Sequence, residues 1–137
     1  MNVLSIAMTL FLAIISLSVL HTEGAGGSLP NVIIETELGN IEIAVYSDKA
    51  PLSSASFLEA IDKNLFPGNG SFYRAVHQDN DNEFPKIEVI QGGIIDQAMA
   101  LPLIFHETTK QTGLLHLNGS VSLGRREKST GSGTTFF

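Results

Sequence analysis

The chain contains no cysteine, and this absence excludes disulfide bonds, catalysis by a thiolate and zinc sites built on thiolates. Basic residues are also scarce: eight lysines and arginines stand against fourteen acidic residues, a formal net charge of -6. Such a balance offers no electrostatic footprint for nucleic acid or for an anionic membrane surface. No internal repeat is present. Because disulfide bonds and zinc–thiolate sites are excluded, the stability of the fold must come from packing.

The composition that remains is typical of one globular domain. The 137 residues leave room for a single core, and 43% of them are apolar whereas 16% are charged. Several short strand-like segments occur with one helix-like segment, and strands and helices do not alternate along the chain. The sequence therefore predicts a mainly β fold, an antiparallel sheet or barrel.

Residues 1–25 are predicted to be a targeting segment. No charged side chain occurs from Val3 to Leu20, and the polar, small-residue stretch HTEGAGGS follows. This pattern is typical of a cleaved export signal. The uncharged run is also just long enough to span a bilayer, so an uncleaved membrane anchor is the alternative. In either case we expect an exported protein that is periplasmic, extracellular or anchored to the membrane through this segment.

Residues 31–137 are expected to form the folded domain, which opens with a hairpin and a helix. The alternation in NVIIETELGNIEIAVY predicts two strands joined by a tight turn at Gly39-Asn40. After Pro51, apolar residues recur at helical spacing, which predicts a helix that ends before Phe66-Pro67. Either Ser53 or Ser54 is a suitable N-cap for this helix.

Shorter segments fill the rest of the domain. The sequence predicts a strand at 71–76, an exposed loop at 77–86 and a strand at 87–91, followed by a turn at Gly92-Gly93. Pro102 makes residues 101–105 an edge or irregular segment. A small strand is expected at 120–123, a turn at 131–134, and the beginning of another strand at Phe136-Phe137.

Seven segments follow one another in the order ETELGNIEIAVY, KAPLSSASFLEAI, FYRAV, KIEVIQGG, HETT, GLLHLNGSVSLGR and GSGTTFF. In this order they resemble the cyclophilin-type peptidyl-prolyl isomerases, specifically their exported bacterial-like branch. The resemblance runs from about Val32 to Phe137. It implies a closed antiparallel barrel of eight strands capped by two helices. Because that family continues beyond the final Phe-Phe, we expect a truncated cyclophilin that lacks the C-terminal strands and the second helix.

The resemblance implies rotation about the peptide bond that precedes proline, a reaction that needs no metal or other cofactor. The barrier of about 18–20 kcal/mol exists because the amide nitrogen lone pair is delocalised into the carbonyl. A guanidinium is always protonated and can donate towards the lone pair that is localised only when the amide is twisted. By resemblance, Arg74 is this catalytic residue. The expected partners are proline-containing peptides or unfolded protein clients.

The resemblance also implies a set of substrate-binding residues. Phe72 is expected on the same strand face as Arg74, whereas Tyr73, where histidine is frequent, should face the opposite side. Gln91 would orient the arginine and contact the substrate backbone. Phe137 would form part of the floor of the proline pocket. The peptide would lie along Gly124 and Arg125 and beside Thr135, where the family usually has glutamine or glutamate; Gly124 itself replaces an alanine.

A function without catalysis is the alternative to the isomerase interpretation. A lone arginine in a strand is usually a solvated or ion-paired surface residue, and only its setting between FY and the later IQGG favours a site. Glu88 and Val89 occupy positions where many members of the family have a phenylalanine and a methionine that line the pocket. The alternative is therefore a proline-peptide-binding module without catalysis, or an inactive fragment.

Overall fold

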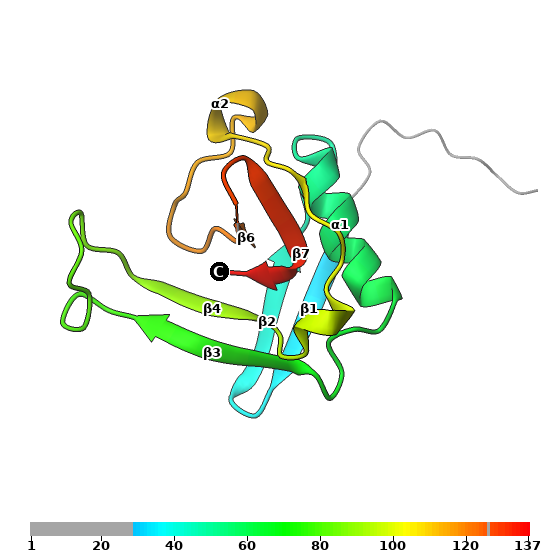
Figure 1. Cartoon of the computed structure of the whole chain (residues 1–137), viewed down its shortest axis with the longest axis horizontal. Helices are drawn as coiled ribbons and strands as arrows, with labels where there is room; N and C mark the ends of the chain where they lie inside the picture. Colours follow the sequence, from blue (N-terminus) through cyan, green and yellow to red (C-terminus); the bar gives the residue numbers. More distant parts are fainter. Residues whose placement is uncertain (1–28, 126) are drawn as a thin grey trace, which may run out of the picture.

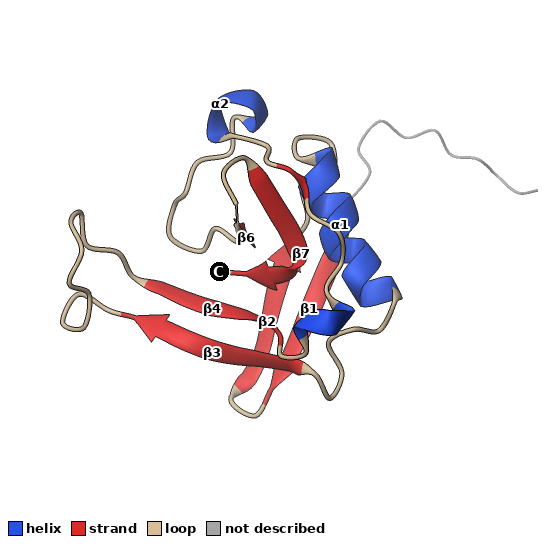
Figure 2. Ribbon diagram, viewed as in Figure 1, coloured by secondary structure: helices blue, strands red, loops and turns tan. Residues whose placement is uncertain are grey.

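The computed structural model describes residues 29–125 and 127–137, and the predicted targeting segment at 1–25 lies outside them. The described part is mainly β and antiparallel, as predicted, with a two-stranded sheet, a five-stranded sheet and one long helix, α1 (Figures 1 and 2). Within these residues no helix has the length and apolar character needed to cross a membrane.

The two-stranded sheet is the predicted N-terminal hairpin. Strand β1 (Asn31–Thr36) pairs with β2 (Gly39–Ala44), and Thr36 lies opposite Gly39. The turn is therefore formed by residues 37 and 38, earlier than the predicted Gly39-Asn40. The Thr36 side chain closes it, because its Oγ1 accepts from the Leu38 N–H at 3.2 Å and donates to the Gly39 carbonyl at 2.7 Å. The positive φ of 128° falls on Gly39, directly after the turn.

Helix α1 (Pro51–Asp62) confirms the predicted helix but not its predicted cap. Ala50 is the N-cap residue, and no side chain at this position supplies a hydrogen bond. Instead, the Glu107 carboxylate accepts from the backbone N–H groups of Leu52 at 3.1 Å and Ser53 at 2.7 Å. A carboxylate at a helix N-terminus satisfies free donors and interacts favourably with the helix dipole. The prediction of Ser53 or Ser54 was wrong because the cap comes from a distant segment.

The larger sheet is built around the last strand of the chain. Strand β7 (Thr130–Phe136) pairs with β4 (Val89–Ile94), β5 (Ile104–Phe105) and β6 (Leu123–Gly124), and β4 pairs in turn with β3 (Gly70–Val76). The strand predictions at 71–76 and 87–91 are confirmed with shifted ends, and β5 is a short edge strand, as the proline suggested. Two predicted turns, at 92–93 and at 131–134, are wrong, because both segments lie inside strands.

Close packing explains why those strands are rich in glycine. A β-carbon on Gly133 would stand 2.2 Å from the Ser56 carbonyl oxygen, because α1 lies directly against β7. The Gly133 N–H donates to Ser56 Oγ at 2.9 Å across this contact. A β-carbon on Gly93 would stand 2.4 Å from the Thr134 carbonyl oxygen of the neighbouring strand. These glycines thus serve close backbone approach rather than a turn.

Aromatic packing between α1 and the larger sheet forms the centre of one core cluster, to which the hairpin adds Ile43, and a second cluster gathers around Ile94. The Phe136 ring contacts the rings of Phe57, Phe66 and Phe72 edge-on, at centroid distances of 5.7, 6.1 and 6.1 Å. Offset and edge-to-face geometries of this kind are the favourable ones for aromatic pairs. Phe136 is buried, and the next residue along the strand returns to the surface.

Two short helical turns complete the described fold. A 3-10 turn, η1 (Gln97–Met99), begins at Asp96, whose side chain accepts from the Ala98 N–H at 3.0 Å. Helix α2 (Thr109–Thr112) was not predicted from the sequence. It is closed by a capping box between Thr108 and Gln111 and is followed by Gly113 in a left-handed conformation.

Candidate functional site

Arg74 and Gln91 face each other across strands β3 and β4. They are register partners, and Arg74 Nη1 donates to Gln91 Oε1 at 3.3 Å. Arg74 is exposed, and among the described residues it forms no ion pair. Its other N–H donors are therefore available to a ligand. The structure brings together the two residues that the sequence analysis placed at the centre of the site.

A bulge in β3 rearranges the residue before the arginine. Phe72 pairs with Gly92 and Arg74 pairs with Gln91, so that Tyr73 is an extra residue with no partner on β4. The alternation of strand faces is broken at that point. As a result, Tyr73 lines the same pocket as Gln91, although the sequence predicted that it would face away.

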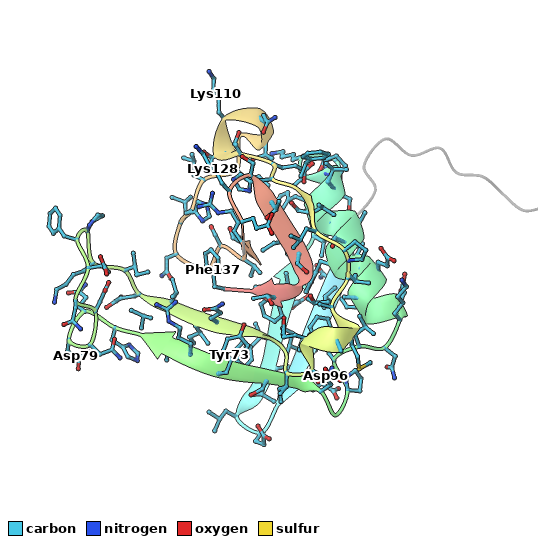
Figure 3. All side chains as sticks on the ribbon, in the orientation of Figure 1. Tyr73, Asp79, Asp96, Lys110, Lys128 and Phe137 are labelled. Atoms are coloured by element: carbon cyan, nitrogen blue, oxygen red, sulfur yellow. The ribbon has the colours of Figure 1, made fainter. Side chains whose placement is uncertain are left out.

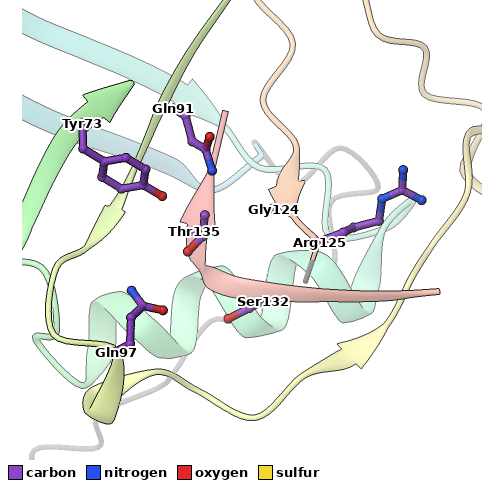
Figure 4. A pocket seen from close by; sticks show the side chains of 7 residues that line it. All are labelled: Tyr73, Gln91, Gln97, Gly124, Arg125, Ser132 and Thr135. Atoms are coloured by element: carbon purple, nitrogen blue, oxygen red, sulfur yellow. The ribbon is translucent and has the colours of Figure 1, made fainter. Parts of the chain in front are cut away.

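The pocket beside Gln91 has a volume of about 200 Å³ and is mainly polar in its side chains (Figure 4). Four residues that the sequence analysis assigned to substrate binding line it together, although they come from β4, from β6 and its continuation, and from β7. Tyr73, Gln97 and Ser132 also line it and were not predicted. No local signal marks those three, because a bulge in β3, the pairing of β7 and the turn η1 after β4 bring them to one place. The predicted four are Gln91, Gly124, Arg125 and Thr135.

Three predicted site residues are not among those that line this pocket: Arg74 and the two aromatic residues, Phe72 and Phe137. Phe72 packs edge-on against Phe136 and lines a larger hollow, of about 700 Å³, between β1 and β3. Phe137 follows β7 and is 37% exposed. Its backbone exchanges two hydrogen bonds of 2.9 Å with Ser122, which fixes it beside the segment that leads to Gly124 (Figure 3). The apolar side chain of Phe137 is thus held at the surface, beside the segment that carries Gly124.

One carboxyl group near the site has a shifted pKa. The backbone N–H groups of Glu83 and Ile87 donate to Asp81 and lower its pKa below the ordinary value of 3.8, and the charges of Lys86 and Arg74 act in the same direction. Burial opposes this shift. The described residues contain no group of three or more histidine or acidic side chains placed to hold a metal ion.

Comparison with known proteins agrees with this fold. Residues 31–137 match the family model described as "Cyclophilin type peptidyl-prolyl cis-trans isomerase/CLD". The chain belongs to the cyclophilin-type peptidyl-prolyl cis-trans isomerase family.

Two curated relatives show the extent of the likeness. A peptidyl-prolyl cis-trans isomerase of Acinetobacter baylyi is 31% identical over 117 residues, which cover 80% of this chain and 55% of the relative. Peptidyl-prolyl cis-trans isomerase A of Dickeya dadantii is 26% identical over 127 residues, which cover 90% of this chain and 61% of the relative. The chain thus spans a little over half the length of these relatives. No solved structure matched the chain.

Proposed function

We propose that this protein catalyses cis–trans isomerisation of the peptide bond before proline, with Arg74 as the catalytic residue. The observation that carries the proposal is the cross-strand pair in which Gln91 accepts one N–H of an exposed guanidinium that forms no ion pair with the residues that the structure describes. Family membership supports the same reaction.

The geometry supplies what the reaction needs from a protein. Twisting the amide localises the lone pair on the proline nitrogen, and a donor aimed at that nitrogen stabilises the twisted state more than the planar one. Gln91 restrains the Arg74 side chain, so that the remaining N–H donors keep a fixed direction. Each 1.36 kcal/mol of such stabilisation is worth a factor of ten in rate.

Proline-containing peptides and unfolded protein clients are the proposed substrates. The pocket formed with Gln91, Arg125 and Thr135 offers polar groups for the chain around the proline. Phe137, which is partly exposed, offers an apolar surface for the proline itself. A neutral, extended peptide fits this combination because neither part requires a charged ligand.

The second candidate is a module that binds proline peptides without catalysis. The exposure of the Arg74–Gln91 pair favours it, because water weakens a charge-assisted donor that acts strongly in a drier site. The two candidates make different predictions for the same variant. Loss of the guanidinium abolishes rate acceleration in the first, whereas in the second no acceleration exists to be lost.

The test is isomerisation of a short proline peptide by the full chain, with Arg74→Ala and Arg74→Lys as variants. We expect both variants to lose roughly 10²–10³-fold in kcat/KM, because lysine keeps the charge but not the planar donor arrangement. Peptide binding measured separately should change much less. A wild-type rate equal to that of Arg74→Ala and to that of the uncatalysed reaction, with peptide binding intact, would establish the non-catalytic alternative.

We also propose that the apolar N-terminal segment directs the protein out of the cytoplasm. The support is the run from Val3 to Leu20, which contains no charged side chain and is followed by small polar residues. Expression in a Gram-negative bacterium followed by fractionation and mass measurement tests it. A shortened periplasmic product indicates a cleaved signal, a full-length membrane product indicates an anchor, and a full-length cytoplasmic product contradicts the proposal.

A further inference from the structure

The connection between β3 and β4, residues 77–88, is a loop held by internal hydrogen bonds, and we call it the tip loop. Asn80 Oδ1 accepts from the His77 N–H at 2.7 Å near its start. Asp81, only 9% exposed, accepts from the N–H groups of Glu83 at 2.9 Å and Ile87 at 2.8 Å. One carboxylate thus ties the middle of the loop to its end. The loop projects from the far end of the two strands, where Asp79 marks it in Figure 3.

This ordered loop presents an uncovered phenyl ring. Phe84 is 96% exposed, and the described residues make no ring contact with it. It lies between Glu83 and Ile87, the two residues whose backbone Asp81 holds. Ile87 is itself 46% exposed. The hydrogen bonds of the loop therefore maintain an apolar surface in water instead of allowing it to fold inward.

The tip loop is continuous with the proposed isomerase site. Arg74 lies two residues before the end of β3, and Gln91 lies two residues after the start of β4. The same pair of strands therefore carries both the site and the loop. An extended chain advances about 3.3 Å per residue, so a longer client can reach the loop with a segment several residues from the bound proline, whereas a short proline peptide cannot. The field of Arg74 also acts on Asp81, which agrees with this proximity.

The charge of the loop defines the chemistry that it would accept. Residues 77–88 contain four acidic side chains and one lysine. An exposed aromatic ring among carboxylates is complementary to an apolar side chain with basic neighbours. The isomerase site, by contrast, is suited to a neutral peptide. The tip loop is therefore suited to an apolar segment with basic neighbours, whereas the isomerase site that it adjoins is suited to a neutral segment.

We propose that the tip loop is a second docking surface for the unfolded client, binding an apolar segment with basic flanks while a proline of the same chain occupies the Arg74 site. The proposal rests on the proposed isomerase function. Because the two surfaces bind one client, the loop raises the effective concentration of nearby prolines at the site. Short proline peptides, which cannot reach the loop, gain nothing from it.

The experiment uses the full chain and its variants Phe84→Ser and Leu38→Ser. Leu38 is the matched control, since it is 101% exposed at the turn of the other hairpin. Three substrates are compared: a short proline peptide, a disulfide-free protein whose refolding is limited by proline isomerisation, and a fluorescein-labelled Arg-Leu-Phe-Leu-Arg peptide without proline. Glu83→Lys is a second variant that leaves the ring in place and reverses one charge.

We expect Phe84→Ser to weaken binding of the labelled peptide and kcat/KM on the refolding protein by roughly tenfold, the effect of partly burying one phenyl ring. Activity on the short peptide should stay within about twofold. Glu83→Lys should weaken the labelled peptide as well, and Leu38→Ser should behave as wild type. Unchanged binding in Phe84→Ser, or an equal loss in Leu38→Ser, overturns the proposal. If the wild type fails to isomerise the short peptide, the proposed function fails, and the labelled peptide still decides the role of the loop.

Discussion

The side-chain methyl of Thr135 occupies the space into which a side chain on residue 124 would project. A β-carbon built on Gly124 stands 2.6 Å from Thr135 Cγ2 and 3.2 Å from Thr135 Cβ, whereas real β-carbons essentially never approach closer than 3.0 Å. By the resemblance described above, the family is expected to have alanine at residue 124 and glutamine or glutamate at residue 135, so that both residues of this chain depart from the expected pattern. The two departures are thus one packing arrangement, in which a branched side chain requires a glycine opposite.

Gly124→Ala alone should therefore destabilise the protein, and Thr135→Ser should relieve the effect. We expect Gly124→Ala to lower the free energy of unfolding by about 1–3 kcal/mol, as in other overpacked sites. Serine lacks the clashing methyl, so the double variant should recover most of the loss. Urea unfolding of the four proteins gives the coupling energy. Additive effects of the two substitutions would show that the contact is not the cause.

Gly133 and Gly131, on the same strand, should respond very differently to alanine. A β-carbon on Gly133 meets backbone atoms of α1, which cannot move aside as a side chain can, so Gly133→Ala should cost about 3 kcal/mol or more. A β-carbon on Gly131 would meet nothing nearer than 3.7 Å, and Gly131→Ala should change stability by less than about 1 kcal/mol. Thermal unfolding of both variants measures the difference. Equal losses would mean that the helix does not lie against the strand as described.

The distant cap on α1 makes Glu107 a stabilising residue. Glu107→Ala should lower the free energy of unfolding by about 1–2 kcal/mol, because it leaves the N–H groups of Leu52 and Ser53 without their acceptor. Glu107→Gln should retain part of that energy through its amide oxygen. Glu59→Gln is the control, since it breaks only the exposed Lys63–Glu59 pair at 2.7 Å and should change stability by less than about 0.5 kcal/mol. Denaturant unfolding in which Glu107→Ala matches the control would rule out the capping role.

The lowered pKa of Asp81 predicts a pH dependence of stability. A carboxyl group whose pKa is lower in the folded state stabilises that state above its ordinary pKa of 3.8, and the contribution is lost as the pH falls through the lower, folded value. Wild type should therefore be more stable than Asp81→Asn at pH 6, and the difference should shrink as the pH is lowered below 3.8. Unfolding curves of both proteins from pH 6 to pH 2.5 measure it. A difference independent of pH would contradict the role assigned to the carboxylate.

Hydrophobic periodicity was sufficient for the hairpin and for α1, because local patterns determine which face of each element is apolar. It failed for residues 131–134 and for the glycine pair at 92–93, where small residues predict a turn locally but the structure uses them for close packing in strands. The prediction of the helix cap failed for a related reason. Its acceptor, Glu107, lies far away in the sequence, and no local signal points to it.

For the candidate site, the sequence by itself determined the family, the mainly antiparallel β class and the assignment of Arg74 and Gln91 as a pair, because these depend on residue types in a fixed order. Only the tertiary structure decided that Tyr73 lines the pocket, that Thr135 and Gly124 pack as partners, and that Phe84 stays exposed on an ordered loop. Each of these depends on a bulge, a strand pairing or a buried carboxylate. The bulge and the strand pairing arise from contacts between segments distant in the chain, and the Asp81 hydrogen bonds lie in an irregular loop, so neither kind of feature leaves a periodic trace in the sequence.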